Sequence, residues 1–127
     1  MRNFKATILV VLCVMGVSLV LQAGQNSLGI ADSRQIKFEN PMRVGNVLLP
    51  AGEYKVQHTM EGTEHIMVFT QMHARQTPAE ARVKCSLVPL TSKAEQTQQI
   101  YVMNSANERV LHELVFRGDI AKHVFVE

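Results

Sequence analysis

Short stretches of alternating apolar and polar residues, separated by turn-forming pairs, constrain the fold of this 127-residue chain more than any other feature. Residues 54–60 and 81–87 alternate with period two, as expected of strands that bury one face. Gly45-Asn46 suits a two-residue hairpin turn, and Gly118-Asp119 is a second turn-forming pair. The pattern predicts one small all-β domain, an antiparallel barrel or sandwich of about eight strands joined mostly by hairpins.

Two segments between the expected strands carry a competing signal. Residues 77–80 (Thr-Pro-Ala-Glu) and 92–95 (Ser-Lys-Ala-Glu) both match the capping box that begins many helices. The first also has proline at the first helical position, where its fixed φ is favourable. We therefore expect one or two short helical turns beside the strands.

The most regular predicted hairpin runs from Tyr54 to Phe69. A two-residue turn at its tip would place His58 opposite His65, with Tyr54 and Phe69 on the same side of the hairpin. A three-residue turn would bring Ile66 to that side instead, because a one-residue shift moves every side chain to the other face.

The first 23 residues differ in composition from the rest. They contain Arg2 and Lys5 but no acidic residue, and residues 6–21 form an apolar run of 16 residues. A basic start, an apolar run shorter than the roughly 20 residues of a membrane span, and a small residue at Ala23 are typical of a cleaved secretory signal peptide. We expect a signal peptide over 1–23, a flexible leader over 24–33 and a domain over 34–127. That domain would be periplasmic or extracellular, with no membrane span after cleavage.

Cleavage changes the charge and cysteine counts. The whole chain has 13 Lys and Arg against 11 Asp and Glu, and removal of two basic residues with the signal leaves 11 of each. A neutral domain without a basic cluster argues against binding to nucleic acid. Cys85 is then the only cysteine, which excludes an internal disulfide. We expect a buried, inert thiol, and the alternative is a homodimer linked through Cys85.

One segment resembles a known group of proteins. Residues 41–54, Pro-Met-Arg-Val-Gly-Asn-Val-Leu-Leu-Pro-Ala-Gly-Glu-Tyr, resemble the VG…LPAGxY segment of small exported bacterial proteins of unknown function, especially from Acidobacteria-like genomes. The resemblance runs from the signal peptide to about Phe69 and continues more weakly to Asp119. It implies an exported β domain and transfers no catalytic residue. The shorter Leu-Pro-Ala-Gly-Glu-Tyr also resembles turns of prealbumin-like and carboxypeptidase-regulatory-like β-sandwich modules.

Imidazole and thioether side chains gather within sixteen residues of the sequence: His58, Met60, His65, Met67, Met72 and His73. Imidazole is a ligand for both zinc and copper, and thioether suits copper. Two imidazoles facing each other across a hairpin, with Cβ atoms roughly 5 Å apart, would be able to share an ion. His58 and His65 are thus the candidate metal ligands, and the alternative is that methionine fills core gaps while histidine lies in solvent.

Catalytic signatures are missing from the sequence. It contains no Gly-x-Ser-x-Gly, no His-Glu-x-x-His and no phosphate-binding glycine-rich loop. The favoured interpretation is an exported noncatalytic β domain without a cofactor, a binding or structural module whose partner is a protein or a component of the cell envelope. The alternative is a periplasmic copper- or zinc-binding protein that uses His58 and His65.

Overall fold

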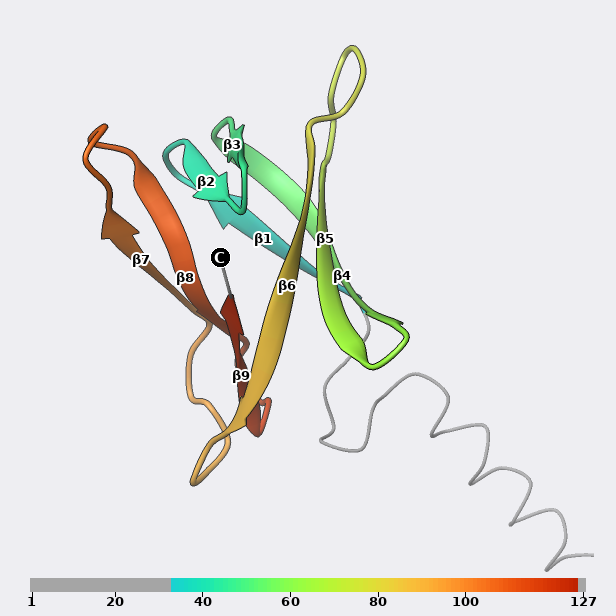
Figure 1. Ribbon diagram of the computed structural model, residues 1–127, viewed down its shortest axis with the longest axis vertical. Coiled ribbons are helices and arrows are strands. Elements are labelled where there is room, and N and C mark those ends of the chain that lie inside the picture. The colour runs from blue at the N-terminus through green and yellow to red at the C-terminus, as the bar shows by residue number, and fades with distance from the viewer. Residues whose placement is uncertain (1–32, 126–127) are drawn as a thin grey trace, which may run out of the picture.

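Nine strands form one continuous sheet in the computed structural model, which describes residues 33–125 (Figure 1). The strands are β1 (Ser33–Phe38), β2 (Met42–Val44), β3 (Val47–Leu49), β4 (Gly52–Glu61), β5 (Glu64–Gln71), β6 (Glu80–Pro89), β7 (Gln98–Met103), β8 (Arg109–Val115) and β9 (Ala121–Phe125). The prediction of an all-β domain is confirmed. The expected signal peptide and nearly all of the expected leader lie outside the described residues.

The strand order is β1-β4-β5-β6-β9-β8-β2-β3, and β7 pairs with β8. The expected hairpins β2–β3, β4–β5, β5–β6, β7–β8 and β8–β9 are present. Two further antiparallel pairs, β1–β4 and β6–β9, join strands that are not consecutive, so the sheet is not a simple meander. In the described sheet β2 and β8 are the one parallel pair, at Arg43 and Val110. β1 is an additional strand that the sequence pattern did not separate.

The sheet curves until β1 approaches β7, but these two strands share no backbone ladder in the described part of the chain. Side chains bridge the gap. The Gln99 amide on β7 donates a hydrogen bond to the Lys37 carbonyl on β1, at 2.8 Å. Arg34 on β1 donates to the Asp119 carboxylate at 2.5 Å, and its guanidinium lies 5.4 Å from the Phe116 ring centroid. The fold is therefore an open, strongly curved single sheet, intermediate between the closed barrel and the two-sheet sandwich that were predicted.

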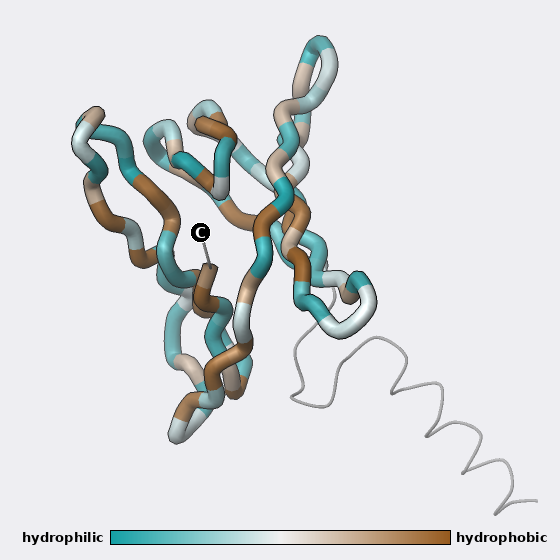
Figure 2. Tube along the Cα trace, in the orientation of Figure 1, coloured by the Kyte–Doolittle hydropathy of each residue, from teal (hydrophilic) through white to brown (hydrophobic). Residues whose placement is uncertain are grey.

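The hydrophobic core lies inside this curve, between one wall of β1, β4, β5 and β6 and a second wall of β2, β3, β8 and β9 (Figures 1 and 2). Phe38 packs against Tyr54 and Phe69, with ring centroids 5.2 and 6.2 Å apart. The Tyr54 hydroxyl donates to the Pro50 carbonyl at 2.6 Å, so its polar atom is satisfied despite burial. The largest fully buried side chains are Tyr54, Phe38, Phe69, Leu49, Met67, Leu114, His123, Val44 and Val56.

A bulge in β8 explains the irregular burial of that strand. Ile100 pairs with Glu113 and Tyr101 with Leu111, which leaves His112 as an extra residue. The extra residue lets Leu111 and Leu114 both face the core although they are three positions apart, while His112 is exposed.

The two expected helical turns are absent from the described chain, and backbone hydrogen bonds explain why. The Gln71 amide donates to the Ala79 carbonyl at 2.8 Å, so residues before β6 extend the β5 ladder instead of starting a helix. The Ala94 amide donates to the Asp119 carbonyl, and the Ala94 carbonyl accepts from Gly118. Tertiary pairing thus outweighs both local capping signals.

Glycine is required in the hairpin that connects β2 and β3. Gly45 has φ of +59°, and positive φ at the first turn position is typical of the type II′ turn. A Cβ at this position would also lie 3.4 Å from the Arg82 carbonyl oxygen, because the turn packs closely on β6. The turn therefore sets the position of the β2–β3 hairpin against the opposite wall.

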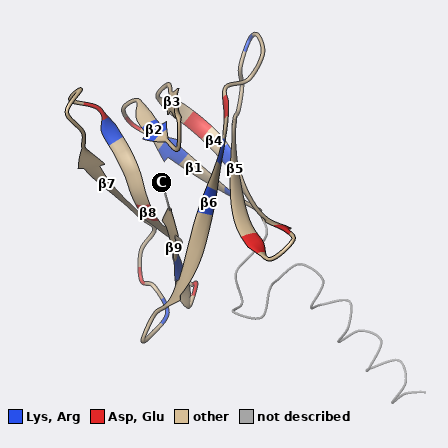
Figure 3. Cartoon of the chain, viewed as in Figure 1, with Lys and Arg blue, Asp and Glu red and all other residues tan. Residues whose placement is uncertain are grey.

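Charged side chains of both signs are spread over the strands and turns (Figure 3). Arg82 and Lys84 point away from the core, as predicted, and pair with Glu61 and Glu64 on the neighbouring hairpin. Arg43 on β2 makes a bidentate pair with Glu108, with both N–O distances 2.9 Å, and Asn104 donates to the same carboxylate at 3.0 Å. These hydrogen bonds, Arg43 first, lower the pKa of Glu108 to about 2.

Substitution of Glu108 by glutamine is expected to remove a pH-dependent part of the stability. Because the folded pKa of about 2 lies below the ordinary value of 4.5, ionised Glu108 stabilises the fold fully above pH 4.5, and the contribution is lost as the pH falls toward 2. Urea unfolding between pH 7 and pH 2 should show the wild type losing more free energy of unfolding than Glu108→Gln over that interval. Parallel pH profiles for the two proteins would contradict this role.

Candidate metal centre

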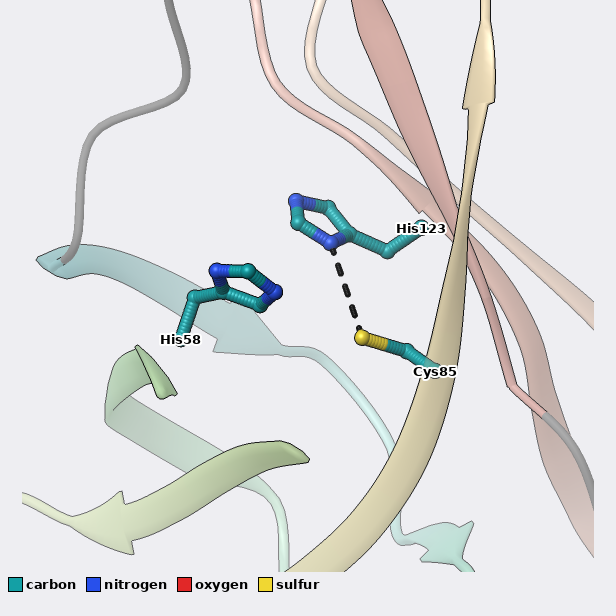
Figure 4. A group of neighbouring side chains, drawn as sticks. All are labelled: His58, Cys85 and His123. Carbon is teal, nitrogen blue, oxygen red and sulfur yellow. Dashed lines mark hydrogen bonds between the residues drawn. The ribbon is translucent and has the colours of Figure 1, made fainter. Parts of the chain in front are cut away.

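Three histidines and a cysteine meet at one end of the core. His58 lies on β4, His65 on β5, Cys85 on β6 and His123 on β9. The pairing of the four strands brings all of these side chains to the same end of the core. Figure 4 shows the side chains of His58, Cys85 and His123 lying close together.

The ligand atoms of this cluster have spacings close to those of a metal site. One atom each from His58, Cys85 and His123 lie within 4.8 Å of one another. Cys85 Sγ is 3.9 Å from His123 Nδ1, and His65 Nδ1 is 3.0 Å from His58 Nε2. Ligands bound to one zinc ion through N and S atoms lie about 3.3–3.8 Å apart, so the more widely spaced atoms would have to approach by about 1 Å to bind one ion.

His123 is an unusual residue for a hydrophobic core. It is fully buried, with its ring 5.3 Å from His58 and 5.9 Å from Phe116. Burial, followed by the charges of His58, His65 and Arg34, lowers the pKa of His123 to about 4, so the ring is neutral near pH 7 and has a lone pair to offer. Among the described residues its Nε2 has no hydrogen-bond partner. An unsatisfied buried polar atom costs about 1–3 kcal/mol.

Cys85 is buried, with 6% of its surface exposed, and it is the only cysteine in the described residues. Burial raises the pKa of its thiol to about 11, so the thiol keeps its proton until a metal displaces it. A disulfide to a second chain would require this sulfur to reach the surface, which its position disfavours. The homodimer linked through Cys85 stays a prediction.

The predicted pairing of His58 with His65 is wrong in register. The turn lies at Gly62-Thr63, so His58 faces Met67 and Met60 faces His65. The register differs from the predicted one by two residues, and an even shift keeps every side chain on its expected face. The two histidines are therefore diagonal neighbours, and the prediction that they lie together is confirmed by the 3.0 Å contact between their rings.

Other members of the predicted cluster lie elsewhere. Met72 and His73 follow the far end of β5, where His73 Nε2 is 3.4 Å from the Glu53 carboxylate. The two histidines of the last two strands, His112 and His123, are not paired with each other. His112 is the exposed bulge residue, and Leu114 pairs with His123 instead.

Cys85 and His123 were missed as metal ligands, although both occupy inward positions of predicted strands. Their proximity depends on the pairing of β6 with β9, across 38 residues of sequence. No local pattern predicts that pairing. The one sequence feature that pointed to His123 as a ligand was its inward-facing position on the last predicted strand.

Comparison with known proteins adds no further assignment. No protein-family model, curated protein or solved structure matches the chain. The resemblance to small exported bacterial proteins therefore stays a prediction. Within residues 33–125, no helix is long and apolar enough to cross a membrane.

Proposed function

We propose that this chain is an exported, noncatalytic β domain that binds one Zn(II) or Cu(I) ion between His58, Cys85 and His123. The observation that carries the proposal is the convergence of three ligand atoms from three strands within 4.8 Å of one another. Both ions accept imidazole and thiolate ligands. His65 Nδ1, 3.0 Å from His58 Nε2, is the nearest additional donor.

The protonation states of the cluster support binding of a cation. His123 is neutral near pH 7 and needs to lose no proton, whereas Cys85 must release its thiol proton to water as the metal–sulfur bond forms. Arg34, the cation whose charge acts on His123, is already paired with the Asp119 carboxylate. The nearby positive charge is thus compensated before a metal arrives.

Metal titration tests the proposal. We expect the metal-free protein to bind one equivalent of Co(II), a spectroscopic substitute for Zn(II), with a thiolate-to-cobalt charge-transfer band in its absorption spectrum. Cys85→Ala should lose that band, and His58→Ala should weaken binding by at least about 100-fold because a direct ligand contributes more than an outer-shell partner. Native mass spectrometry of the Zn(II)- and Cu(I)-loaded protein gives the stoichiometry.

His112→Ala is the matched control, because His112 is an exposed histidine outside the cluster. It should bind metal like the wild type. His58→Ala is preferred to a change at His123, since His58 is only half-buried and its loss leaves the core intact. A wild-type protein that binds no stoichiometric metal, or a His58→Ala variant with unchanged affinity, would overturn the proposal.

The expectation of a protein or envelope partner remains a second proposal, and β7 is the surface that supports it. Six uncharged residues form this strand, and it pairs only with β8 in the described sheet. Its apolar side chains are 38–52% exposed: Ile100, Tyr101, Val102 and Met103. By contrast, the edge strand β1 contains Arg34 and Lys37, and charge is a common protection of an edge. An extended strand of a partner protein would find its apolar contacts on β7.

A further inference from the structure

Two His-x-Met sequences lie face to face on β4 and β5. His58 and Met60 are two residues apart on β4, and His65 and Met67 are two residues apart on β5. In the observed register His58 pairs with Met67, and Met60 pairs with His65. Residues two apart on a strand share a face, and so do directly paired residues. The four side chains therefore form one block, which we call the His–Met block: His58, Met60, His65 and Met67.

The His–Met block leads from the surface to the buried cluster. Met60 is 50% exposed, His58 and His65 are half-buried, and Met67 is 1% exposed. A surface pocket of about 540 Å³ is lined by His58, Met60 and His65, among others. His58 belongs both to this pocket and to the group with Cys85 and His123. The exposure of the sulfur and nitrogen donors thus falls from the thioether of Met60, through the two half-buried imidazoles, to the buried thiol of Cys85.

Core packing accounts for only part of this arrangement. Methionine often fills irregular gaps in a core, and this is sufficient to explain the buried Met67. Met60 is half-exposed, and it lies directly across from His65, with which it lines the same pocket. A thioether is a soft donor that Cu(I) accepts, whereas zinc sites in proteins are built from thiolate, imidazole and carboxylate.

We infer that the ion held between His58, Cys85 and His123 is Cu(I), with the thioethers of Met60 and Met67 as supporting soft donors beside His58 and His65. The inference rests on the proposed metal site and specifies its cargo. Copper stays Cu(I) throughout, so no electron is transferred. As the copper–sulfur bond to Cys85 forms, the thiol proton leaves to water and the donor that carried the ion is released.

Competition titrations under anaerobic conditions test this specificity. Cu(I) would be supplied on a colorimetric Cu(I) chelator, and Zn(II) affinity would be measured separately with a zinc-responsive dye. We expect the double variant Met60→Leu/Met67→Leu to bind Cu(I) at least about tenfold more weakly, in the range seen when supporting groups of a metal site are lost. Its Zn(II) affinity should be unchanged. Leucine conserves the side-chain volume, so the fold should tolerate both changes.

Met103→Leu is the matched control, because Met103 is also 50% exposed but lies on β7. Its Cu(I) affinity should equal that of the wild type. Unchanged Cu(I) affinity in the double variant, together with loss of binding in His58→Ala, would overturn the Cu(I) assignment and leave the metal site standing. A wild type that binds neither Cu(I) nor Zn(II) would overturn both proposals. Equal loss of Cu(I) and Zn(II) affinity in the double variant would also overturn the Cu(I) assignment.

Discussion

Replacing Phe69 with alanine is expected to lower the free energy of unfolding by about 3–5 kcal/mol. Phe69 is completely buried, its ring stacks with Phe38 at 6.2 Å, and it meets the edge of Phe125 at 5.9 Å. The truncation would remove contacts to both walls of the core at once. Since a small domain has only about 5–15 kcal/mol of stability, this loss would remove a large part of it.

Urea unfolding followed by circular dichroism would measure this effect. Tyr54→Ala should cost a similar amount, because Tyr54 is equally buried beside Phe38. Tyr54→Phe is the control, since it keeps the ring and loses only the hydrogen bond to Pro50, worth about 1 kcal/mol. Wild-type stability in Phe69→Ala would mean that the core is not where the structure places it.

Local sequence signals predicted the parts of the fold that local interactions determine. The turn at Gly45, the alternation in residues 54–60 and the inward face of Cys85 follow from φ preferences and from period-two burial. The hairpin register was wrong by two residues because the turn formed one residue later, at Gly62-Thr63. The predicted inward and outward positions were still correct, because a register shift by an even number of residues leaves every side chain on the same face.

Those local signals do not predict which strands pair over long distances in the sequence. The capping boxes at residues 77–80 and 92–95 have favourable local chemistry, but ladder and turn hydrogen bonds to Ala79 and Ala94 prevent helix formation. The bulge at His112 likewise depends on how β8 fits between β7 and β9. In each case the tertiary partner, and not the segment itself, decides the backbone conformation.

The same division applies to the metal centre. His58 and His65 belong to one hairpin, so their proximity was predictable from sequence spacing. Cys85 and His123 become neighbours only when β9 docks on β6. The proposed site therefore combines histidines from one hairpin with two residues that long-range strand pairing brings together. For this reason the sequence indicated the hairpin histidines as ligands but not the thiol.

Removal of the Arg34 side chain is the second change expected to have a large effect. Asp119 is 2% exposed and receives its charge-assisted hydrogen bond from Arg34 at 2.5 Å. Arg34→Met would leave a buried carboxylate without a counter-charge, which typically costs about 3–5 kcal/mol. It would also release β1 from the β8–β9 turn, at the seam that backbone pairing does not close.

The stability lost in Arg34→Met should depend on pH, and the direction of that dependence distinguishes a buried charge from lost packing. Burial already raises the pKa of Asp119, and Arg34 opposes that rise through its charge and its hydrogen bond. Without Arg34 the folded state should bind a proton at Asp119 more readily than the unfolded state does, so stability should increase as the pH falls. Urea unfolding at several pH values should therefore show the deficit of the variant shrinking under acidic conditions. A deficit that is independent of pH would point to lost packing and not to a buried charge.

A double variant separates the charge pair from its surroundings. Arg34→Met/Asp119→Leu removes both charges, so no ion remains to be desolvated, and an apolar pair of similar volume often matches a buried salt bridge in stability. The double variant should therefore be more stable at pH 7 than Arg34→Met alone, although it carries one more substitution. Two contacting residues are expected to show such non-additivity, whereas independent sites would give additive losses. Additive losses would mean that Asp119 does not depend on Arg34, and that the seam between β1 and the β8–β9 turn is held by other contacts.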